Sequence, residues 1–397
     1  MVIVGVTWGM ALVWIYKATS VLFGMRHIAD LNEIDISELP ELETGLEPHV
    51  TVIVPACNEE QSIESSLASL LAQENIRVQI VAVDDRSTDE TGARMEAVAA
   101  ETSRIGSPHE LVAIRNRELP PGWLGKPHAM SLGVAQATSR WILLTDADMH
   151  FAPLCLSRAV RLAEAWRTDH MVLLPTLIRK TWTESAMLGV FQVLAQWSLR
   201  LWKVEDPKAR DFLGVGGFNL IRSTTLEAIG GMEAVRLEVV EDMSIGWLVK
   251  HNGFRTTVAV GPGQASIRWF EGALGMVANL EKNGFAAFRF NLSLILFAVM
   301  ALSLQIVLPV AALFCGWGGI AATAAMYAGI GIGYRANRKV NGASPLQALG
   351  YAAALAVLCW GFLRSTFLTI RRGGVSWRGT FYPLEELKRG MIQWRAW

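Results

Sequence analysis

The sequence predicts an α/β domain with a mostly parallel sheet, joined to apolar helices at both ends of the chain. Short β-rich runs alternate with helical patterns between residues 49 and 290, as in sheets whose strands are linked by helices. The runs are apolar throughout, which is typical of strands covered on both faces. Charged residues make up 18% of the chain, against about 25% in soluble domains, so we expect part of the chain to lie in lipid.

Apolar patterns and the turn residues between them define the elements of this domain. The predicted strands are 49–56, 77–85, 141–148 and 170–178. The predicted helices are 59–73, 90–103 and 152–166. We expect the domain to extend over residues 49–265, after a polar and acidic linker at 26–48.

Residues 1–25 form the predicted N-terminal transmembrane helix. The run is apolar except for Lys17, and its length suffices for a hydrocarbon core of about 30 Å. A cleaved signal peptide is disfavoured, because no basic region precedes the run and no A-x-A site follows it. Lys17 leaves open an anchor that lies in the plane of the membrane.

The C-terminal part predicts a transmembrane region at 291–370 with about three helices, at the apolar runs 292–314, 317–334 and 345–368. The basic loop 334–345 favours the cytoplasmic side. This places the domain in the cytoplasm and makes the protein a multi-pass protein of the inner membrane. Three crossings would put the tail, 371–397, outside, although its basic residues favour the cytoplasmic side. One of the three apolar runs could therefore be re-entrant or lie in the interface. Residues 266–290 mix aromatic and basic side chains and are predicted to lie at the interface.

Overall composition excludes several classes of function. The net charge is zero and the pI is about 7.1, so no electrostatic attraction to nucleic acid is expected. The four cysteines are widely scattered, with neither a disulfide framework nor a zinc-binding spacing. A reducing compartment is therefore expected.

Acidic residues gather where two predicted strands end. Asp84 and Asp85 follow one apolar run, and Asp146 and Asp148 follow another. Ligands of such sheets bind at the carboxyl ends of the strands. Residues at i and i+2 of an extended segment point the same way, so Asp146 and Asp148 can converge on a divalent cation that also takes phosphate oxygens. The alternative is that these aspartates cap the helices that follow.

Six motifs occur in order over about residues 50–250: "VIVPACNEE", "VAVDDRSTDET", "GKPHAMSLGV", "LLTDAD", "GGFNLIRSTTLEAIGG" and "VVEDMSIGWLV". Together they resemble the family 2 glycosyltransferases. That resemblance implies a GT-A fold for nucleotide-sugar binding, and inversion at the anomeric carbon. It also implies Mg²⁺ or Mn²⁺ and the diphosphate at Asp146 and Asp148, and the catalytic base at Asp242. The nucleoside would lie near Pro55, Ala56, Asn58, Glu59, Asp84 and Asp85.

These residue types agree with glycosyl transfer. The leaving diphosphate must be neutralised, which a divalent ion does, and the acceptor hydroxyl must lose a proton, which a carboxylate accepts. Glu238 and Glu241 are alternatives to Asp242 as the base, and Glu241 is also assigned to the acceptor side.

Other motif residues receive roles around the donor and the acceptor. Lys126 lies in a predicted loop rich in proline and glycine, where it can meet a phosphate or a sugar hydroxyl, with His128 close by. Gly216 and Gly217 offer backbone N–H groups near Asp242 on the acceptor side. A solvated loop lysine and a simple turn are the alternatives.

The acceptor is less clearly indicated. Processive family members carry Q/R-x-x-R-W; here Arg268 and Trp269 are present, but Ala265 stands at the first position. We assign Arg268 and Trp269 to the acceptor side, where Trp269 is alternatively an interfacial aromatic. The arrangement of membrane segments resembles bacterial carotenoid, hopanoid-associated and ceramide glycosyltransferases, which implies a membrane lipid acceptor. We expect the donor to be UDP-linked. A polysaccharide synthase, a polyprenyl-phosphate glycosyltransferase and a non-catalytic membrane binding protein are the alternatives.

Overall fold

The chain folds into two units, and each is assembled from segments that are distant in the sequence. The structure is a computed structural model that describes residues 1–42, 48–342 and 344–394. The helical unit contains Met1–Ile28, Leu177–Trp202 and Arg268–Trp377. The sheet unit contains the described residues of Ala29–Thr176, Lys203–Ile267 and Arg378–Trp397.

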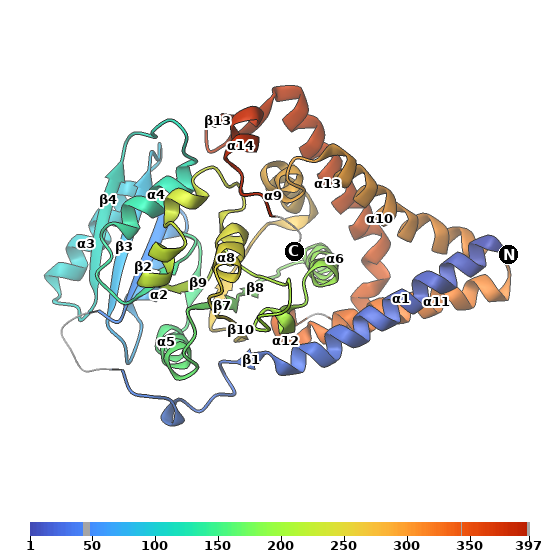
Figure 1. Ribbon diagram of the computed structural model, residues 1–397, viewed down its shortest axis with the longest axis horizontal. Helices are drawn as coiled ribbons and strands as arrows, with labels where there is room; N and C mark the ends of the chain where they lie inside the picture. The colour runs from blue at the N-terminus through green and yellow to red at the C-terminus, as the bar shows by residue number, and fades with distance from the viewer. Residues whose placement is uncertain (43–47, 343, 395–397) are drawn as a thin grey trace. The chain divides into compact units, whose positions relative to one another are not determined.

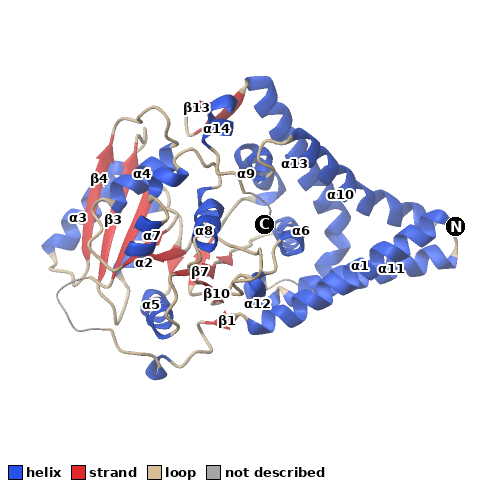
Figure 2. Cartoon of the chain, in the orientation of Figure 1, coloured by secondary structure: helices blue, strands red, loops and turns tan. Residues whose placement is uncertain are grey.

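An eight-stranded sheet of order β1-β10-β7-β9-β5-β2-β3-β4 forms the centre of the sheet unit. Only β9 is antiparallel to its neighbours, β5 and β7, so the prediction of a mostly parallel sheet is confirmed. Figure 2 shows helices on both sides of its β2–β4 part. The strands are Ala29–Asp30 (β1), Val50–Ala56 (β2), Val78–Asp85 (β3), Glu110–Asn116 (β4), Trp141–Leu144 (β5), His170–Leu174 (β7), Asn219–Arg222 (β9) and Thr256–Val260 (β10).

The smaller strands and the helices of this unit frame the sheet. Strand β6 (His150–Phe151) pairs antiparallel with β11 (Ala265–Ile267), and β8 (Thr176–Leu177) lies at the boundary of the units. The helices are Ile63–Leu71 (α2), Thr91–Arg104 (α3), Gly125–Val134 (α4), Cys155–Ala165 (α5), Ser223–Ala228 (α7), Glu241–His251 (α8) and Leu384–Gly390 (α14), and β13 is Thr380–Pro383.

The continuous apolar strands β2 and β3 form the core beneath the loops that follow them. All residues of β2 and β3 are buried. Ile53 and Val83 pack in one cluster with Ala129 and Met130 of α4. Helix α4 approaches the sheet closely at Gly133, where an added Cβ would lie 2.5 Å from Cγ2 of Ile53. A larger residue at this position would push α4, and the side chains at its first turn, away from the sheet.

The helical unit consists mainly of long apolar helices. They are Val2–Gly24 (α1), Trp182–Ser198 (α6), Gly272–Ala287 (α9), Leu292–Leu313 (α10), Trp317–Ala336 (α11), Arg338–Asn341 (α12) and Tyr351–Arg372 (α13), followed by β12 (Gly374–Trp377). Helices α1 and α11 lie side by side (Figure 1). Gly329 of α11 allows this approach, because an added Cβ would lie only 3.0 Å from the backbone nitrogen of Ile15.

Three helices in the described residues are long and apolar enough to cross a membrane: Val2–His27, Leu292–Leu313 and Pro345–Arg372. The first agrees with the predicted N-terminal span. In the C-terminal region two of the three expected helices meet the criterion, whereas α11, which is rich in glycine and alanine, does not. The expectation of about three C-terminal membrane helices is therefore supported for α10 and α13 by length and composition.

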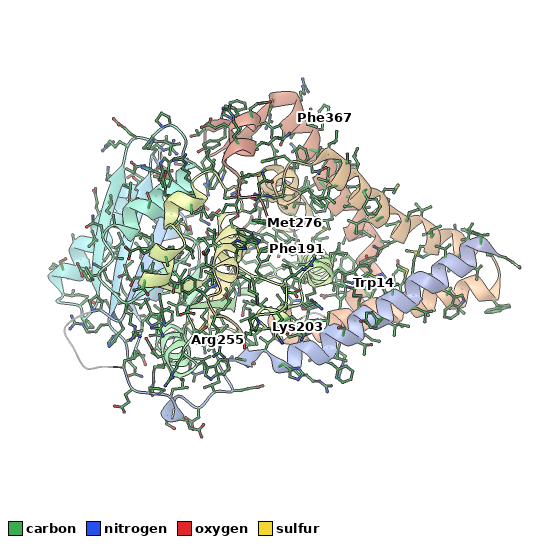
Figure 3. All side chains as sticks on the ribbon, in the orientation of Figure 1. Trp14, Phe191, Lys203, Arg255, Met276 and Phe367 are labelled. Atoms are coloured by element: carbon green, nitrogen blue, oxygen red, sulfur yellow. The ribbon has the colours of Figure 1, made fainter. Side chains whose placement is uncertain are left out.

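Buried polar side chains connect the apolar helices. Trp14, labelled in Figure 3, is fully buried and donates from Nε1 to Oε1 of Gln305 over 3.1 Å. Tyr351 donates to the same oxygen over 2.8 Å. Gln196 and Asn337 exchange two amide hydrogen bonds, of 2.5 and 2.9 Å. Polar groups that are removed from water keep partners in this way, and each pair fixes the rotation of two segments against each other.

Two segments contain more regular structure than the sequence predicted. In the expected linker 26–48, Ala29–Asp30 forms β1 and extends the sheet beside β10, because Ile28 and Leu31 on either side are buried. Residues 43–47 of that segment lie outside the described residues. In the expected tail 371–397, β12, β13 and α14 form, and Tyr382, Leu387 and Met391 are buried. The basic residues of the tail concealed this apolar pattern.

Candidate active site

The shared direction of the parallel strands β2, β3 and β5 brings the acidic loops to one edge of the sheet unit. Pro55 and Ala56 end β2 and are paired with Val83 and Asp84 of β3. The loop after β5, with Asp146 and Asp148, follows the strand on the other side of β2. Motifs that are widely separated in the sequence therefore meet at this edge, as the sequence predicted.

Asp84 and Asp85 face different partners because successive side chains of a strand point to opposite faces. The Asp84 carboxylate lies against the first turn of α3, where an added Cβ on Gly92 would be 2.3 Å from its Oδ2. It also accepts a hydrogen bond from Ser87 N over 3.3 Å. Asp84 thus faces the start of α3 without capping it, because the N-cap residue of this helix is Glu90 and no side-chain cap hydrogen bond is formed there among the described residues.

Asp85 is bound by a guanidinium and an amide. Arg86 donates from Nε and from a terminal nitrogen to the two carboxylate oxygens over 3.0 and 2.9 Å. Nδ2 of Asn116 donates over 2.8 Å and lies 3.2 Å from Nδ1 of His128. Burial lowers the pKa of His128, which favours the neutral ring. The negative charge at the end of β3 is thus compensated by specific donors.

The turn after β2 is locked to the loop after β3. Asn58 has φ of 56°, and its side-chain oxygen accepts from Thr88 N over 2.8 Å. Asn58 N donates to Ser87 Oγ, and Glu59 N donates to Thr91 Oγ1, over 2.9 and 2.7 Å. The backbone around Asn58 and Glu59 is therefore held in one conformation beside Asp84.

Lys126 lies in the first turn of α4 rather than in a loop, so this sequence prediction was wrong. The proline-rich segment ends at Leu124, and Pro127 is compatible with a helix because the first turn needs no N–H partner. Nζ of Lys126 lies 2.6 Å from Oδ1 of Asp146 and 2.6 Å from Oε1 of Glu241. Burial alone would lower the pKa of Lys126, but the surrounding carboxylates raise it well above its ordinary value.

Asp242 is the second residue of α8, and its carboxylate is oriented by backbone N–H groups. Gly216 N donates to Oδ2 and Met243 N donates to Oδ1, both over 2.8 Å. Burial, together with the charge of Glu241, raises the pKa of Asp242 to about 6, while Lys126 acts in the opposite direction. The group is thus ionised near neutral pH and still able to take up a proton.

A glycine loop makes this arrangement possible. An added Cβ on Gly214 would lie 1.8 Å from the carbonyl oxygen of Asp242. An added Cβ on Gly216 would lie 3.0 Å from Oδ2 of Asp146 and 3.4 Å from Nζ of Lys126. Gly217 is held by its carbonyl, which accepts from Thr145 Oγ1 over 2.7 Å. The predicted proximity of this loop to Asp242 is therefore confirmed.

Asp146 and Asp148 fit a divalent cation by their charge. Burial raises the pKa of Asp148 to about 7, and the charges of Asp146 and Glu59 add to this, whereas Lys126 opposes it. A bound cation would relieve this repulsion. Among the described residues no three His, Cys, Asp or Glu side chains gather as a complete metal site. Diphosphate oxygens and water would have to supply the other ligands.

Arg268 and Trp269 belong to the helical unit and have partners there. Arg268 forms ion pairs with Glu184, over 2.9 Å, and with Glu271. The Trp269 ring lies 4.8 Å from that of Phe191. Glu238, the other alternative base, is buried and accepts from Ile392 N over 2.5 Å. These environments favour structural roles for Arg268 and Glu238 over contact with a substrate.

Several residues that contact the predicted site were missed by sequence reasoning. Asn116 contacts Asp85, while Arg378, Thr380 and Tyr382 contact the turns at Glu59, Arg86 and Gly125. The sequence signal available was "VSWRGTFY", a run with alternating apolar residues after the last apolar helix. It was attributed to the basic tail.

Two curated relatives match parts of this chain in sequence. Succinoglycan biosynthesis protein ExoO of Rhizobium meliloti is 34% identical over 118 residues, which are 30% of each chain. The 4,4'-diaponeurosporenoate glycosyltransferase of Staphylococcus aureus (strain MRSA252) is 23% identical over 214 residues, 53% of this chain and 54% of that protein. The chain thus spans about half or less of these curated relatives.

A solved structure, the mannosyltransferase PcManGT of Pyrobaculum calidifontis in complex with GDP-Man and Mn²⁺, aligns with a TM-score of 0.49 and 19% identity, over 93% of this chain and 96% of that chain. The model of the family Glycosyl transferase family 2 matches residues 51–230, which include the loops after β2, β3 and β5. Residues 51–230 of this protein are therefore similar to the family 2 glycosyltransferases.

Proposed function

We propose that the protein is an inverting glycosyltransferase that moves one sugar from a UDP-linked donor to the hydroxyl of a membrane lipid at the cytoplasmic face of the inner membrane. The observation that carries this proposal is the Asp242 carboxylate, oriented by Gly216 N over 2.8 Å in a cluster with Lys126 and Asp146. A general base, a cation and a carboxylate for a metal–diphosphate group are thus collected in one place.

Asp146 and Asp148 would hold Mg²⁺ or Mn²⁺ together with the donor diphosphate. The metal would supply Lewis-acid stabilisation of the leaving diphosphate. The uncompensated charge at Asp148 supports this assignment. We expect Asp148→Ala to weaken metal-dependent donor binding by about tenfold or more. Equal titration of the variant and the wild type with UDP and Mn²⁺ would count against it.

The protein's own residues would perform the remaining steps. Asp242 would accept the proton of the acceptor hydroxyl as that oxygen attacks the anomeric carbon. Lys126, held between Asp146 and Glu241, would stabilise negative charge on the donor side. Gly216 and Gly217 would shape the acceptor side by backbone alone. The nucleoside would occupy the edge formed by Pro55, Ala56, Asn58, Glu59, Asp84 and Asp85.

The lipid acceptor is supported by the apolar helices and by one of the relatives. Among the described residues, three helices are long and apolar enough to cross a membrane, and the Staphylococcus aureus relative is named a 4,4'-diaponeurosporenoate glycosyltransferase. The relative named for succinoglycan biosynthesis favours a second candidate, transfer to a growing polysaccharide or a polyprenyl-linked sugar. Ala265 at the first position of the processive motif argues against a polymer synthase.

Product analysis would separate these candidates. Purified protein in native-membrane lipids would receive UDP-glucose, UDP-galactose, UDP-GlcNAc or GDP-mannose, each with Mg²⁺ or Mn²⁺, and the lipid extract would be analysed by mass spectrometry. One added sugar on a lipid is expected. A polymer ladder would favour the synthase, a glycosylated polyprenyl phosphate would identify that acceptor class, and no product with any donor would contradict the proposal.

A further inference from the structure

Residues 378–394 follow the last apolar helix and are part of the sheet unit. They form β13 and α14 and continue to Trp394. The side chains of Tyr382, Leu387 and Met391 are buried. We name these residues the closing segment; its first residues contact the candidate site, and its far end contacts the loops before Gly214 and before α8.

Its first residue, Arg378, binds the turn between β2 and α2. The guanidinium forms an ion pair with the Glu59 carboxylate and donates to the carbonyl oxygen of Asn58 over 3.3 Å. Arg378 thus brings a fixed positive charge to a site edge that is rich in carboxylates.

Thr380 and Tyr382 bind the next two site loops. Thr380 Oγ1 accepts from Arg86 over 3.0 Å, and Arg86 holds Asp85 through its other nitrogens. Tyr382 Oη accepts from Gly125 N over 3.2 Å. Gly125 N is one of the N–H groups at the start of α4 that have no partner within the helix, and it lies immediately before Lys126. Tyr382 therefore fixes the helix turn from which Lys126 projects.

The far end of the closing segment binds the loops that lead to Asp242. Ile392 N donates to Glu238 over 2.5 Å, and Gly390 lies against Leu237, where an added Cβ would be 2.3 Å from its side chain. The Trp394 ring lies 5.3 Å from the ring of Phe212. One continuous segment therefore connects the donor-side turns with the loops before Gly214 and before α8.

Three of the seven non-glycine residues with positive φ among the described residues lie where the closing segment meets the donor side. Asn58, Arg86 and Arg378 have φ of 56°, 59° and 48°. Such left-handed conformations cost energy for residues with a side chain, and they persist where surrounding contacts hold them. All three residues take part in the contacts between the closing segment and the turns after β2 and β3. These contacts are therefore part of the structure of the site.

We propose that the closing segment completes the donor site, with Arg378 and Tyr382 as positioning residues for the nucleoside diphosphate. Arg378 acts through Asn58 and Glu59, and Tyr382 acts through the first turn of α4 and Lys126. This inference rests on the proposed function. It assigns part of donor recognition to residues that lie outside the segment matched by the family model and beyond the last apolar helix.

The test is titration of the full-length protein in detergent with UDP and with GDP, each in the presence of Mn²⁺, followed by donor kinetics. Arg378→Ala should weaken binding of the preferred nucleotide by about tenfold, because a charge-assisted contact is lost. Arg378→Lys should recover part of this loss, since the charge remains but the planar fork does not. Tyr382→Phe should raise the donor KM about threefold with little change in kcat.

Arg389→Ala is the matched control, because Arg389 lies in the same segment, is exposed, and contacts only the carbonyl of Glu385 among its hydrogen-bond partners in the described residues. Its nucleotide affinity should equal that of the wild type. The unfolding temperatures of Arg378→Lys and Tyr382→Phe should also be unchanged. Arg378→Ala should have little further effect in a Glu59→Gln background, since the two residues act as a pair.

The outcomes separate the proposed function from the role of the closing segment. Wild-type protein that binds neither nucleotide would overturn the proposed function. Wild-type protein that binds UDP or GDP, with unchanged affinity and KM in Arg378→Ala and Tyr382→Phe, would overturn the role of the closing segment and leave glycosyl transfer from a nucleotide-sugar standing. Equal losses in Arg389→Ala would mean that the segment acts through general stability only.

Discussion

At the scale of single residues, Asp242 is distinguished because its carboxylate is buried, which disfavours the charged form, and yet accepts hydrogen bonds, which favour it. Two backbone N–H groups orient the carboxylate, while burial and Glu241 make its charge costly. We expect Asp242→Asn to bind UDP and Mn²⁺ as the wild type does and to lose about 10²- to 10⁴-fold in kcat, because an amide cannot accept the proton. Parallel titration and turnover assays would measure both, and near-normal turnover would exclude Asp242 as the base.

The same carboxylate predicts a pH dependence. A pKa of about 6 means that Asp242 is protonated, and inactive as a base, below that pH. The charged groups that face it are Glu241 on its own helix, Lys126 of α4 and Asp146 after β5. We expect kcat/KM to fall about tenfold per pH unit below pH 6 and to level off above it. A profile that is flat from pH 5 to 8 would contradict this prediction.

At the scale of elements, α6 and α9 depend on one buried carboxylate. Glu184 completes the capping box of α6 with Thr181, and it also accepts from Gly272 N and from Arg268, both over 2.9 Å. Burial acts to raise the pKa of Glu184, but these hydrogen bonds outweigh it and lower the pKa to about 2. The shift therefore stabilises the fold above pH 4.5, and this contribution is lost as pH falls from about 4.5 to about 2.

Replacement of Glu184 should expose this dependence. We expect Glu184→Gln to reduce the free energy of unfolding at pH 7 by about 3 kcal/mol, because the half-buried Arg268 loses its buried partner and keeps only the exposed Glu271. Thermal unfolding followed by circular dichroism would measure it. The neighbouring exposed Thr183→Ala is the control and should change stability little. A Glu184→Gln variant as stable as the wild type would show that the ion pair does not hold these helices.

Elements also show how far the sequence could predict this protein. Strands β2, β3 and β5 were predictable because their apolar runs are continuous and end at acidic motifs. The position of Lys126 on α4 was missed because the proline-rich loop ends only two residues before it. The closing segment was missed because its contacts are long-range: Arg378 and Glu59 are 319 residues apart. No local pattern encodes such a pairing, although the alternation in "VSWRGTFY" indicated that the tail is partly buried.

At the scale of the whole molecule, the set of chain segments that form the sheet unit limits how the chain can cross a membrane. This unit contains both Lys203–Ile267 and the residues from Arg378 onward, so they must lie on the same side. An even number of crossings must therefore separate Ile267 from Arg378. Three independent crossings by α10, α11 and α13 are incompatible with the fold, which answers the question raised by the basic tail.

Topology reporters would test this constraint directly. A reporter inserted at the exposed residue Glu118 and one fused after the C-terminus should give the same signal, both cytoplasmic, because the closing segment and the site loops belong to one unit. A reporter in the exposed turn at Gly316 is the control and should report the opposite side if α10 crosses. Opposite signals at Glu118 and the C-terminus would mean that the tail cannot reach Glu59. They would refute the closing segment together with the even number of crossings, while leaving the contacts among Asp146, Lys126 and Asp242 unaffected.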